Sequence, residues 1–233
     1  MIRGRIATSM VDWDGKLATV LFFDRCNFSC PFCQNWGLMT RPEDYPVIDF
    51  EDVLRKLAAR KDWIDGVVLT GGEPLLDPRE LRPVIAEIRK LGFKIKIDTN
   101  GSTPGLLAQL LKDQIVDYVA MDVKASLDDR YQKAAGVRVD PQKIRESIRI
   151  LRSGEVDHEF RTTLVPEIID DEALRKIGEE LRGAKKWFLQ VFVSENAPPG
   201  EFREKKFTPA EIDRFLAIAR EYVPEAKLRG KTT

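Results

Sequence analysis

The chain has 233 residues, of which 43% are hydrophobic and 33% are charged, with 38 basic and 38 acidic side chains. This length and composition predict a single globular domain over residues 1–233. Because the charges balance and form no block of one sign, they give no support for binding to nucleic acid or to a membrane surface. No run approaches ~20 apolar residues, and residues 1–5 lack the apolar core of a signal peptide. We therefore expect a cytoplasmic protein.

Apolar, β-rich runs alternate with amphipathic stretches, which is typical of parallel βα units. Residues 1–16 are expected to form a short extension that turns at Asp14-Gly15. Strands are predicted at 17–23, 66–70, 93–97, 118–121, 158–164 and 187–193. Helices are predicted from 49 to about 60, 77 to about 92, up to about 112, from 140, at 170–182 and at 208–222. Six such units fit either a partial barrel or an open doubly wound sheet.

Polar or small residues follow the first four predicted strands. They are the cysteine run at 26–33, the pair Gly71-Gly72, Asp98, and Asp122 with Lys124. Both candidate architectures bind ligands at the carboxyl ends of their strands. We therefore expect these residues to converge on one face.

The three cysteines, Cys26, Cys30 and Cys33, are the only ones in the chain and have the spacing C-x3-C-x2-C. An odd number of thiols cannot pair fully, so a metal or cluster is favoured over a disulfide framework. Zinc lacks a nearby fourth ligand because the single histidine, His158, is remote in sequence. A 4Fe-4S cluster held by three thiolates would leave one iron open to a cofactor. The plainer alternatives are buried cysteines without a metal and electron storage as in a ferredoxin.

This spacing, with Phe32 before the last cysteine, resembles the signature of the radical S-adenosylmethionine (SAM) enzymes. In that superfamily the open iron binds the amino and carboxylate groups of SAM, and one electron from the cluster cleaves SAM to a 5'-deoxyadenosyl radical. The resemblance covers nearly the whole chain. It implies an α/β fold, a partial (βα)6 TIM-type barrel, with one 4Fe-4S cluster and SAM as cofactors.

The run Gly71-Gly72-Glu73-Pro74 resembles the stretch of that superfamily that receives the SAM amino group. Glycines let backbone approach a ligand closely, and a carboxylate suits an ammonium group. The plainer interpretation is an ordinary turn from a strand into a helix.

Asp98-Thr99-Asn100-Gly101 and Asp122-Val123-Lys124 resemble two motifs of pyruvate formate-lyase activating enzyme and its relatives. The resemblance implies that Asp98, Thr99 and Asp122 help to hold a monovalent cation beside the SAM carboxylate, and that Lys124 approaches the same carboxylate. A helix-capping role is the plainer interpretation of Asp98.

Two further residues follow from the same resemblance. Arg161 is similar to the arginine that the family sends from its fifth strand to SAM, with a surface ion pair as the plainer alternative. Gln190 matches a sixth-strand position near the SAM ribose or adenine, where formate-lyase activators have a histidine nearby. His158 is expected to have no catalytic role.

Within the superfamily, residues 8–16 and the run Cys33-Gln34-Asn35-Trp36 resemble the activating proteins of anaerobic ribonucleoside-triphosphate reductases, although Gln34 stands where a histidine is usual. This resemblance implies an activase that installs a glycyl radical on that reductase, with flavodoxin or ferredoxin as electron donor. Two alternatives stay open. One is a radical SAM enzyme acting on another protein or a small molecule, and the other is a non-enzymatic iron-sulfur module.

Overall fold

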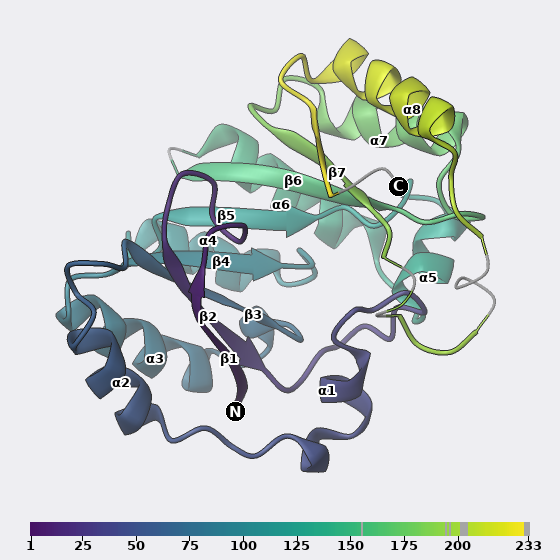
Figure 1. Ribbon diagram of the computed structural model, residues 1–233. Helices are drawn as coiled ribbons and strands as arrows, with labels where there is room; N and C mark the ends of the chain where they lie inside the picture. The colour runs from purple at the N-terminus through teal and green to yellow at the C-terminus, as the bar shows by residue number, and fades with distance from the viewer. Residues whose placement is uncertain (155, 194, 196, 201–204, 231–233) are drawn as a thin grey trace. The chain divides into compact units, whose positions relative to one another are not determined.

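The computed structural model describes residues 1–154, 156–193, 195, 197–200 and 205–230 (Figure 1). Their contacts divide the chain into two compact units, each described here by itself. Unit 1 comprises Met1–Asn27, Gly37–Thr99 and Gly105–Val119, and unit 2 comprises Phe28–Trp36, Asn100–Pro104 and Ala120–Thr233. The assignment of residues 1–233 to a single domain stays a prediction.

In unit 1, four strands lie side by side in chain order: β1 (Ile2–Ser9), β2 (Ala18–Phe23), β3 (Gly66–Gly71) and β4 (Lys94–Thr99). The pairs β2–β3 and β3–β4 are parallel, whereas β1 is antiparallel to β2. Continuous burial of β2 and β3 explains why their sequences are apolar runs without alternation. Strand β1 lies where only an extension was expected. It was not predicted because its arginines and half-exposed positions hide the sequence signal of an edge strand.

The helices of this part of the chain are α1 (Trp36–Thr40), α2 (Phe50–Ala58), α3 (Pro78–Lys90) and α4 (Pro104–Lys112), with short 3-10 helices η1 (Pro42–Asp44) and η2 (Pro74–Leu76). Helices α2 and α3 begin where the sequence predicts them, and α4 ends at the predicted residue, whereas α1, η1 and η2 were not predicted. Asp49 caps α2 and Asp77 caps α3, each accepting a hydrogen bond from a backbone amide of the first turn. The apolar side of α3 buries Leu81, Ile85 and Ile88. Helices α2 and α3 therefore have both a start signal and an apolar face.

A lysine lies in the interior of unit 1. The side chain of Lys96 on β4 is 0% exposed. Its Nζ donates a hydrogen bond to the Asp12 carbonyl at 2.5 Å, lies 3.7 Å from Asp98 Oδ1, and sits 5.2 Å from the ring centroid of Tyr118. Trp13 packs against the same tyrosine at 5.7 Å between ring centroids. A carbonyl, a carboxylate and an aromatic face thus replace the water that this ammonium loses on burial.

In unit 2, β6 (Asp157–Leu164), β7 (Trp187–Val191) and β8 (Lys227–Arg229) are parallel and lie in chain order. The strand β5 (Tyr118–Asp122) has its last residues in this unit, and just beyond it the Val123 amide donates to the Arg161 carbonyl at 2.8 Å. Four helices follow: α5 (Asp129–Ala135), α6 (Pro141–Ser153), α7 (Asp171–Leu181) and α8 (Pro209–Tyr222). Helices α7 and α8 lie side by side (Figure 1).

A buried chain of hydrogen bonds ties β7 to β6 and to the end of β5. Trp187 Nε1 donates to Thr162 Oγ1 at 3.0 Å, and Thr162 Oγ1 donates to the Val123 carbonyl at 2.9 Å. Buried polar groups that are satisfied in this way fix the spacing of strands more specifically than apolar contacts do. The residues that follow β5 are therefore held firmly, which matters for the site below.

Strand β8 and helix α5 were not predicted, and the strand predicted at 187–193 ends at Val191. Elements of three and seven residues are too short for hydrophobic periodicity to reveal. In the described part of the chain, none of the helices has the length and apolarity needed to cross a bilayer.

Replacing Lys96 by methionine is expected to destabilise the protein by about 3–5 kcal/mol, because it keeps the bulk of the side chain but leaves a buried carboxylate without its ammonium partner. Urea unfolding followed by circular dichroism measures this loss. Lys94→Met, at an exposed position of the same strand, is the control. A loss at Lys96 no larger than at Lys94 would contradict the interpretation.

Candidate functional site

In unit 1, the chain segments that leave β2 and β3 are joined by backbone hydrogen bonds. The Gly72 amide donates to the Phe23 carbonyl at 2.8 Å, and the Glu73 amide donates to the Arg25 carbonyl at 2.7 Å. Gly71 has a φ of 110°, and a Cβ atom on Gly72 would overlap the Arg25 carbonyl. Gly72 is therefore required by the close approach of Arg25, the residue before Cys26, whereas Gly71 is required by its positive φ and by the backbone of Phe23.

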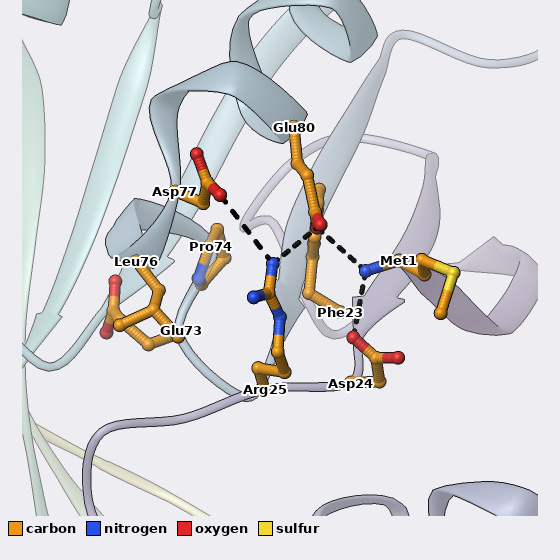
Figure 2. Close-up of a pocket in the computed structure, with 9 residues that line it drawn as sticks. All are labelled: Met1, Phe23, Asp24, Arg25, Glu73, Pro74, Leu76, Asp77 and Glu80. Carbon is orange, nitrogen blue, oxygen red and sulfur yellow. Dashed lines mark hydrogen bonds and ion pairs between the residues drawn. The ribbon is translucent and has the colours of Figure 1, made fainter.

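The side chain of Arg25 is held by carboxylates (Figure 2). It lies 2.6 Å from Glu80 and 3.9 Å from Asp77, both on or beside the first turn of α3. The amino group of Met1 lies 2.8 Å from Glu80 and 2.8 Å from Asp24. These residues line a small pocket that their ion pairs bridge. The ion pairs fix the side chain of Arg25, the residue that precedes Cys26.

Glu73 and Thr99, two of the predicted SAM-contacting residues, meet in unit 1. Glu73 is 2% exposed, and its Oε1 accepts hydrogen bonds from the Leu75 amide at 3.0 Å and from Thr99 Oγ1 at 2.8 Å. Asp98, also buried, lies beside Lys96 as described above. The carboxylate of Glu73 therefore caps η2 and links the end of β3 to the end of β4.

In unit 2, the carboxylate of Asp122 lies between two cations. Arg161 Nε donates to Asp122 Oδ1 at 2.8 Å, and Lys124 Nζ donates to Asp122 Oδ2 at 3.1 Å. The side chains of Lys124 and Arg161 are only 15% and 12% exposed. Together the three side chains form an ion triad of two positive charges and one negative charge. Its net charge of +1 suits an anionic ligand.

Electrostatics keep all three groups of this cluster charged. Burial opposes the ionisation of Asp122, but Arg161 and Lys124 outweigh it and lower the pKa of Asp122 from 3.8 to about 2. Burial likewise works against the Lys124 ammonium, yet Asp122 and then Cys30 hold its pKa above the usual range. Asp122, Lys124 and Arg161 therefore remain an ion triad across the physiological pH range.

Two of the cysteines lie near this triad in unit 2. The Cys33 amide donates to the Cys30 carbonyl at 3.1 Å, which closes a tight turn between them. Burial raises the pKa of the Cys33 thiol and Asp122 adds to this shift, while the Asn35 amide and the Lys124 ammonium oppose it without cancelling it. Lys124 thus offsets part of the cost of forming the thiolate that a metal ligand requires.

The loop that carries these two cysteines is fastened to α5. The Ser29 amide donates to the Ala135 carbonyl at 2.8 Å. Gly136 ends α5 with a φ of 67°, and a Cβ atom there would overlap the Ser29 carbonyl. Phe32 is 5% exposed and packs edge-on against Phe192, with 6.5 Å between ring centroids. Phe32 thus anchors the loop in an apolar environment.

The donor set fits an iron-sulfur cluster in its chemistry. The three cysteines form no disulfide, and two of them lie near the buried ammonium of Lys124, whose charge attracts thiolates. Among the residues that the structure describes, however, no three thiol, imidazole or carboxylate groups gather closely enough to hold a metal ion. The assignment of Cys26, Cys30 and Cys33 as cluster ligands stays a prediction.

Gln190 and His158, the remaining residues considered in the sequence, both lie on strands of unit 2. Gln190 is partly buried on β7, opposite Thr163 of β6 and Arg229 of β8. His158 is buried, and its Nδ1 lies 3.1 Å from the Val156 carbonyl. Burial lowers the pKa of this histidine.

Sequence reasoning missed two buried polar residues, Lys96 in unit 1 and Tyr131 in unit 2. Lys96 has the same parity on β4 as Asp98, so strand alternation could have placed both on one face. Tyr131 lies on the unpredicted helix α5, whose boundaries are marked by the N-cap Asp128 and the left-handed Gly136.

Gly72→Ala is expected to destabilise the protein by at least about 2 kcal/mol, because the new methyl group must displace the Arg25 backbone. Gly105→Ala is the matched control, because a Cβ atom there has no neighbour within 4 Å. Thermal unfolding of both variants measures the difference. Equal melting temperatures would show that the segment around Arg25 is not held as described.

Asp122 is expected to make the unfolding free energy of the protein sensitive to acid. Its folded pKa of about 2 lies below the ordinary value of 3.8, so its stabilisation is present above the ordinary value and is lost as the pH falls toward about 2. The loss amounts to roughly 2 kcal/mol. Asp122→Asn should therefore flatten the decline of the unfolding free energy over this range, measured by urea titration at several pH values. Asp213→Asn, at an exposed position on α8, should keep the wild-type decline, and an equal decline in the Asp122 variant would contradict the assignment.

The chain matches known proteins along most of its length. The model of the family described as the radical SAM superfamily matches residues 20–177. A candidate glycyl-radical enzyme activating enzyme of Methanocaldococcus jannaschii is 28% identical, over 98% of this chain and 95% of its own length. The pyruvate formate-lyase-activating enzyme of Clostridium pasteurianum is also 28% identical, over 79% of each chain.

Solved structures agree in fold. The chain superimposes on Streptococcus suis SuiB bound to S-adenosylmethionine with a TM-score of 0.67 at 18% identity, covering 91% of this chain and 52% of SuiB. A domain of pyruvate-formate lyase-activating enzyme from Bacteroides vulgatus gives a TM-score of 0.55 at 18% identity, covering 71% of this chain and 99% of that domain. The chain thus spans about half the length of SuiB.

These findings confirm the α/β fold of the radical SAM core, the enzyme class, and the 4Fe-4S cluster and SAM that this family implies. They also confirm that glycyl-radical activating enzymes are among its relatives. The chain belongs to the radical SAM superfamily.

Proposed function

We propose that this enzyme installs a glycyl radical on a protein substrate, and that the substrate is an anaerobic ribonucleoside-triphosphate reductase. The observation that carries the proposal is the ion triad of Asp122, Lys124 and Arg161 in the same unit as Cys30 and Cys33. Its net positive charge is what a SAM carboxylate bound near cysteine-held iron requires. Coverage of 95% of the M. jannaschii relative supports an activase rather than a larger enzyme.

In this proposal the residues divide into two groups. Cys26, Cys30 and Cys33 would hold the 4Fe-4S cluster and leave one iron open for SAM. When bound, the cluster and SAM would supply the one-electron radical chemistry that converts a glycine Cα–H of the partner to a glycyl radical, with methionine and 5'-deoxyadenosine as the products of SAM. A reduced flavodoxin or ferredoxin provides the electron.

The second group binds SAM. Lys124 and Arg161 attract its carboxylate, while Gly71, Gly72 and Glu73 receive its amino group. Both oxygens of Asp122 accept hydrogen bonds from the cations, which favours a role in holding Lys124 and Arg161 over a role as ligand of a monovalent ion.

The remaining SAM-contacting positions keep the roles that the resemblance implies. In the proposal, Asp98 and Thr99 are the oxygen donors for a monovalent cation. Phe32 packs beside the cluster, and Gln190 lies near the ribose or adenine. The two acidic groups Asp98 and Glu73 are already held by Lys96 and Thr99 respectively, so they are oriented before a ligand arrives.

A small-molecule substrate is the second candidate. The 7-carboxy-7-deazaguanine synthase of Methanopyrus kandleri is 32% identical, but over only 47% of this chain and 50% of its own. This higher identity over a shorter stretch favours shared SAM chemistry more than a shared substrate.

The proposal is tested by anaerobic reconstitution with iron and sulfide, reduction, and assay of 5'-deoxyadenosine from SAM, with and without the reductase of the same organism. We expect a SAM-dependent doublet of the glycyl radical on the reductase by electron paramagnetic resonance. A variant with Cys33→Ser should give neither product, because a cluster ligand is lost.

The possible results separate the alternatives. Deoxyadenosine without a radical on the reductase would move the assignment to another substrate. Wild-type protein that carries a full cluster and yields neither product would refute the enzymatic proposal.

A further inference from the structure

The turn that joins β1 to β2 is a part of unit 1 that the proposed function leaves unexplained. It follows Ser9, the last residue of β1, and ends before Ala18, the first residue of β2. Met10 and Val11 of this turn are exposed, whereas Trp13 is buried. The β1–β2 turn therefore has one part that faces solvent and another that belongs to the core of unit 1.

Ser9 and Trp13 fix the shape of the β1–β2 turn. Ser9 Oγ accepts hydrogen bonds from the Val11 amide at 3.2 Å and from the Asp12 amide at 3.3 Å, and it donates to the Asp12 carboxylate. Trp13 is part of a buried cluster that also contains Tyr118. The backbone of the turn, including the Asp12 carbonyl, is therefore held in place from both sides of Asp12.

The Asp12 carbonyl accepts a hydrogen bond from a buried ammonium group. Lys96 Nζ donates to it at 2.5 Å and lies 5.2 Å from the ring centroid of Tyr118. The same Nζ lies 3.7 Å from Asp98 Oδ1. Because the side chains of Lys96 and Asp98 are both buried, little water screens this ion pair. The β1–β2 turn, the ammonium and the Asp98 carboxylate thus form one connected series of contacts.

Stability alone does not explain why this ion pair is buried. Replacing both partners of a buried ion pair by apolar side chains of similar volume is often neutral or stabilising, whereas removing one partner is costly. A well-packed core could therefore have apolar residues at both positions. The proposed function, in contrast, requires the Asp98 carboxylate near the end of β4. Lys96 is then the residue that makes a buried carboxylate tolerable at this position.

Strand geometry lets Lys96 act on the orientation of Asp98. The two residues are two positions apart on β4, so their side chains lie on the same face of the strand. An ammonium 3.7 Å from one carboxylate oxygen favours the rotamers of Asp98 that keep this oxygen near it. A side chain that is ordered before a ligand binds reduces the entropy that binding costs.

We propose that Lys96 is a positioning residue for Asp98 and that the β1–β2 turn supports Lys96, so that the turn contributes to the affinity for SAM through these two side chains. The inference rests on the proposed function, because it takes Asp98 as one of the groups that hold SAM and its cation. Lys96 is not a catalytic residue, since it acts through the orientation and charge of Asp98.

The test is a double-mutant cycle on the dissociation constant of SAM, measured by anaerobic equilibrium dialysis with the reconstituted enzyme. Lys96→Met and Asp98→Asn should each weaken SAM binding about tenfold, and the double variant should bind SAM no more weakly than Asp98→Asn alone. This result is expected because Lys96 has no carboxylate to position once Asp98 is replaced. Lys94→Met, at an exposed position of β4, is the control and should keep the wild-type dissociation constant.

The dissociation constant separates positioning from a loss of folded protein. Partial unfolding lowers the number of SAM sites per chain but leaves the dissociation constant of the folded molecules unchanged. Two independent effects would multiply to a loss of about a hundredfold in the double variant. Such a loss, or an unchanged dissociation constant in either single variant, would overturn the inference.

A milder variant covers a Lys96→Met protein that fails to fold. Ser9→Ala removes the hydroxyl that fixes the β1–β2 turn and leaves Lys96 in place. It should weaken SAM binding about threefold in the wild-type background and leave it unchanged in the Asp98→Asn background. Equal effects in both backgrounds, or no effect in either, would overturn the role of the turn.

Failure of the proposed function gives a different result. Wild-type enzyme that carries a full cluster but binds no SAM would refute the proposed function. Wild-type enzyme that binds SAM, with Lys96 and Asp98 acting independently, would refute only the positioning role of Lys96.

Discussion

The charge of the Asp122 carboxylate is the constraint on which the site in unit 2 depends. Arg161 and Lys124 each lie about 3 Å from one of its oxygens, and at an effective dielectric constant of about 20 each contact is worth roughly 5 kcal/mol before desolvation. Without Asp122, two mostly buried cations would lose the carboxylate that both of them contact. With it, the triad keeps one excess positive charge in a place that salt screens weakly.

The cysteine run is held by backbone as much as by side chains. On the side of unit 1, Arg25 is fixed by the Glu73 amide and by ion pairs with α3 (Figure 2). On the side of unit 2, Ser29 is fixed by the end of α5. In both places a glycine makes room for a backbone carbonyl: Gly72 for that of Arg25, just before the cysteine run, and Gly136 for that of Ser29, within it. A glycine beside a loop can thus serve the loop itself, and not only a ligand.

Much of this arrangement could be predicted from the sequence, because strong local signals produced it. Apolar runs gave the strands β2 to β7, and aspartate caps gave the starts of α2, α3, α6 and α7. The apolar run at 118–121 correctly placed Asp122 at the end of β5 and Lys124 just beyond it. The family resemblance is confirmed by the match over residues 20–177.

The remaining features depend on tertiary contacts that local patterns do not record. Burial of Lys96 runs against the strong preference of lysine for the surface, and it is stabilised by contacts that include the carbonyl of Asp12 and the ring of Tyr118, both distant in sequence. Periodicity could not reveal the seven residues of α5. The ends of α5 are set by the Asp128 cap and by Gly136, and Gly136 is required because a Cβ atom there would overlap the Ser29 carbonyl. That overlap involves a residue more than 100 positions away, so it exists only in the folded chain and leaves no local trace in the sequence.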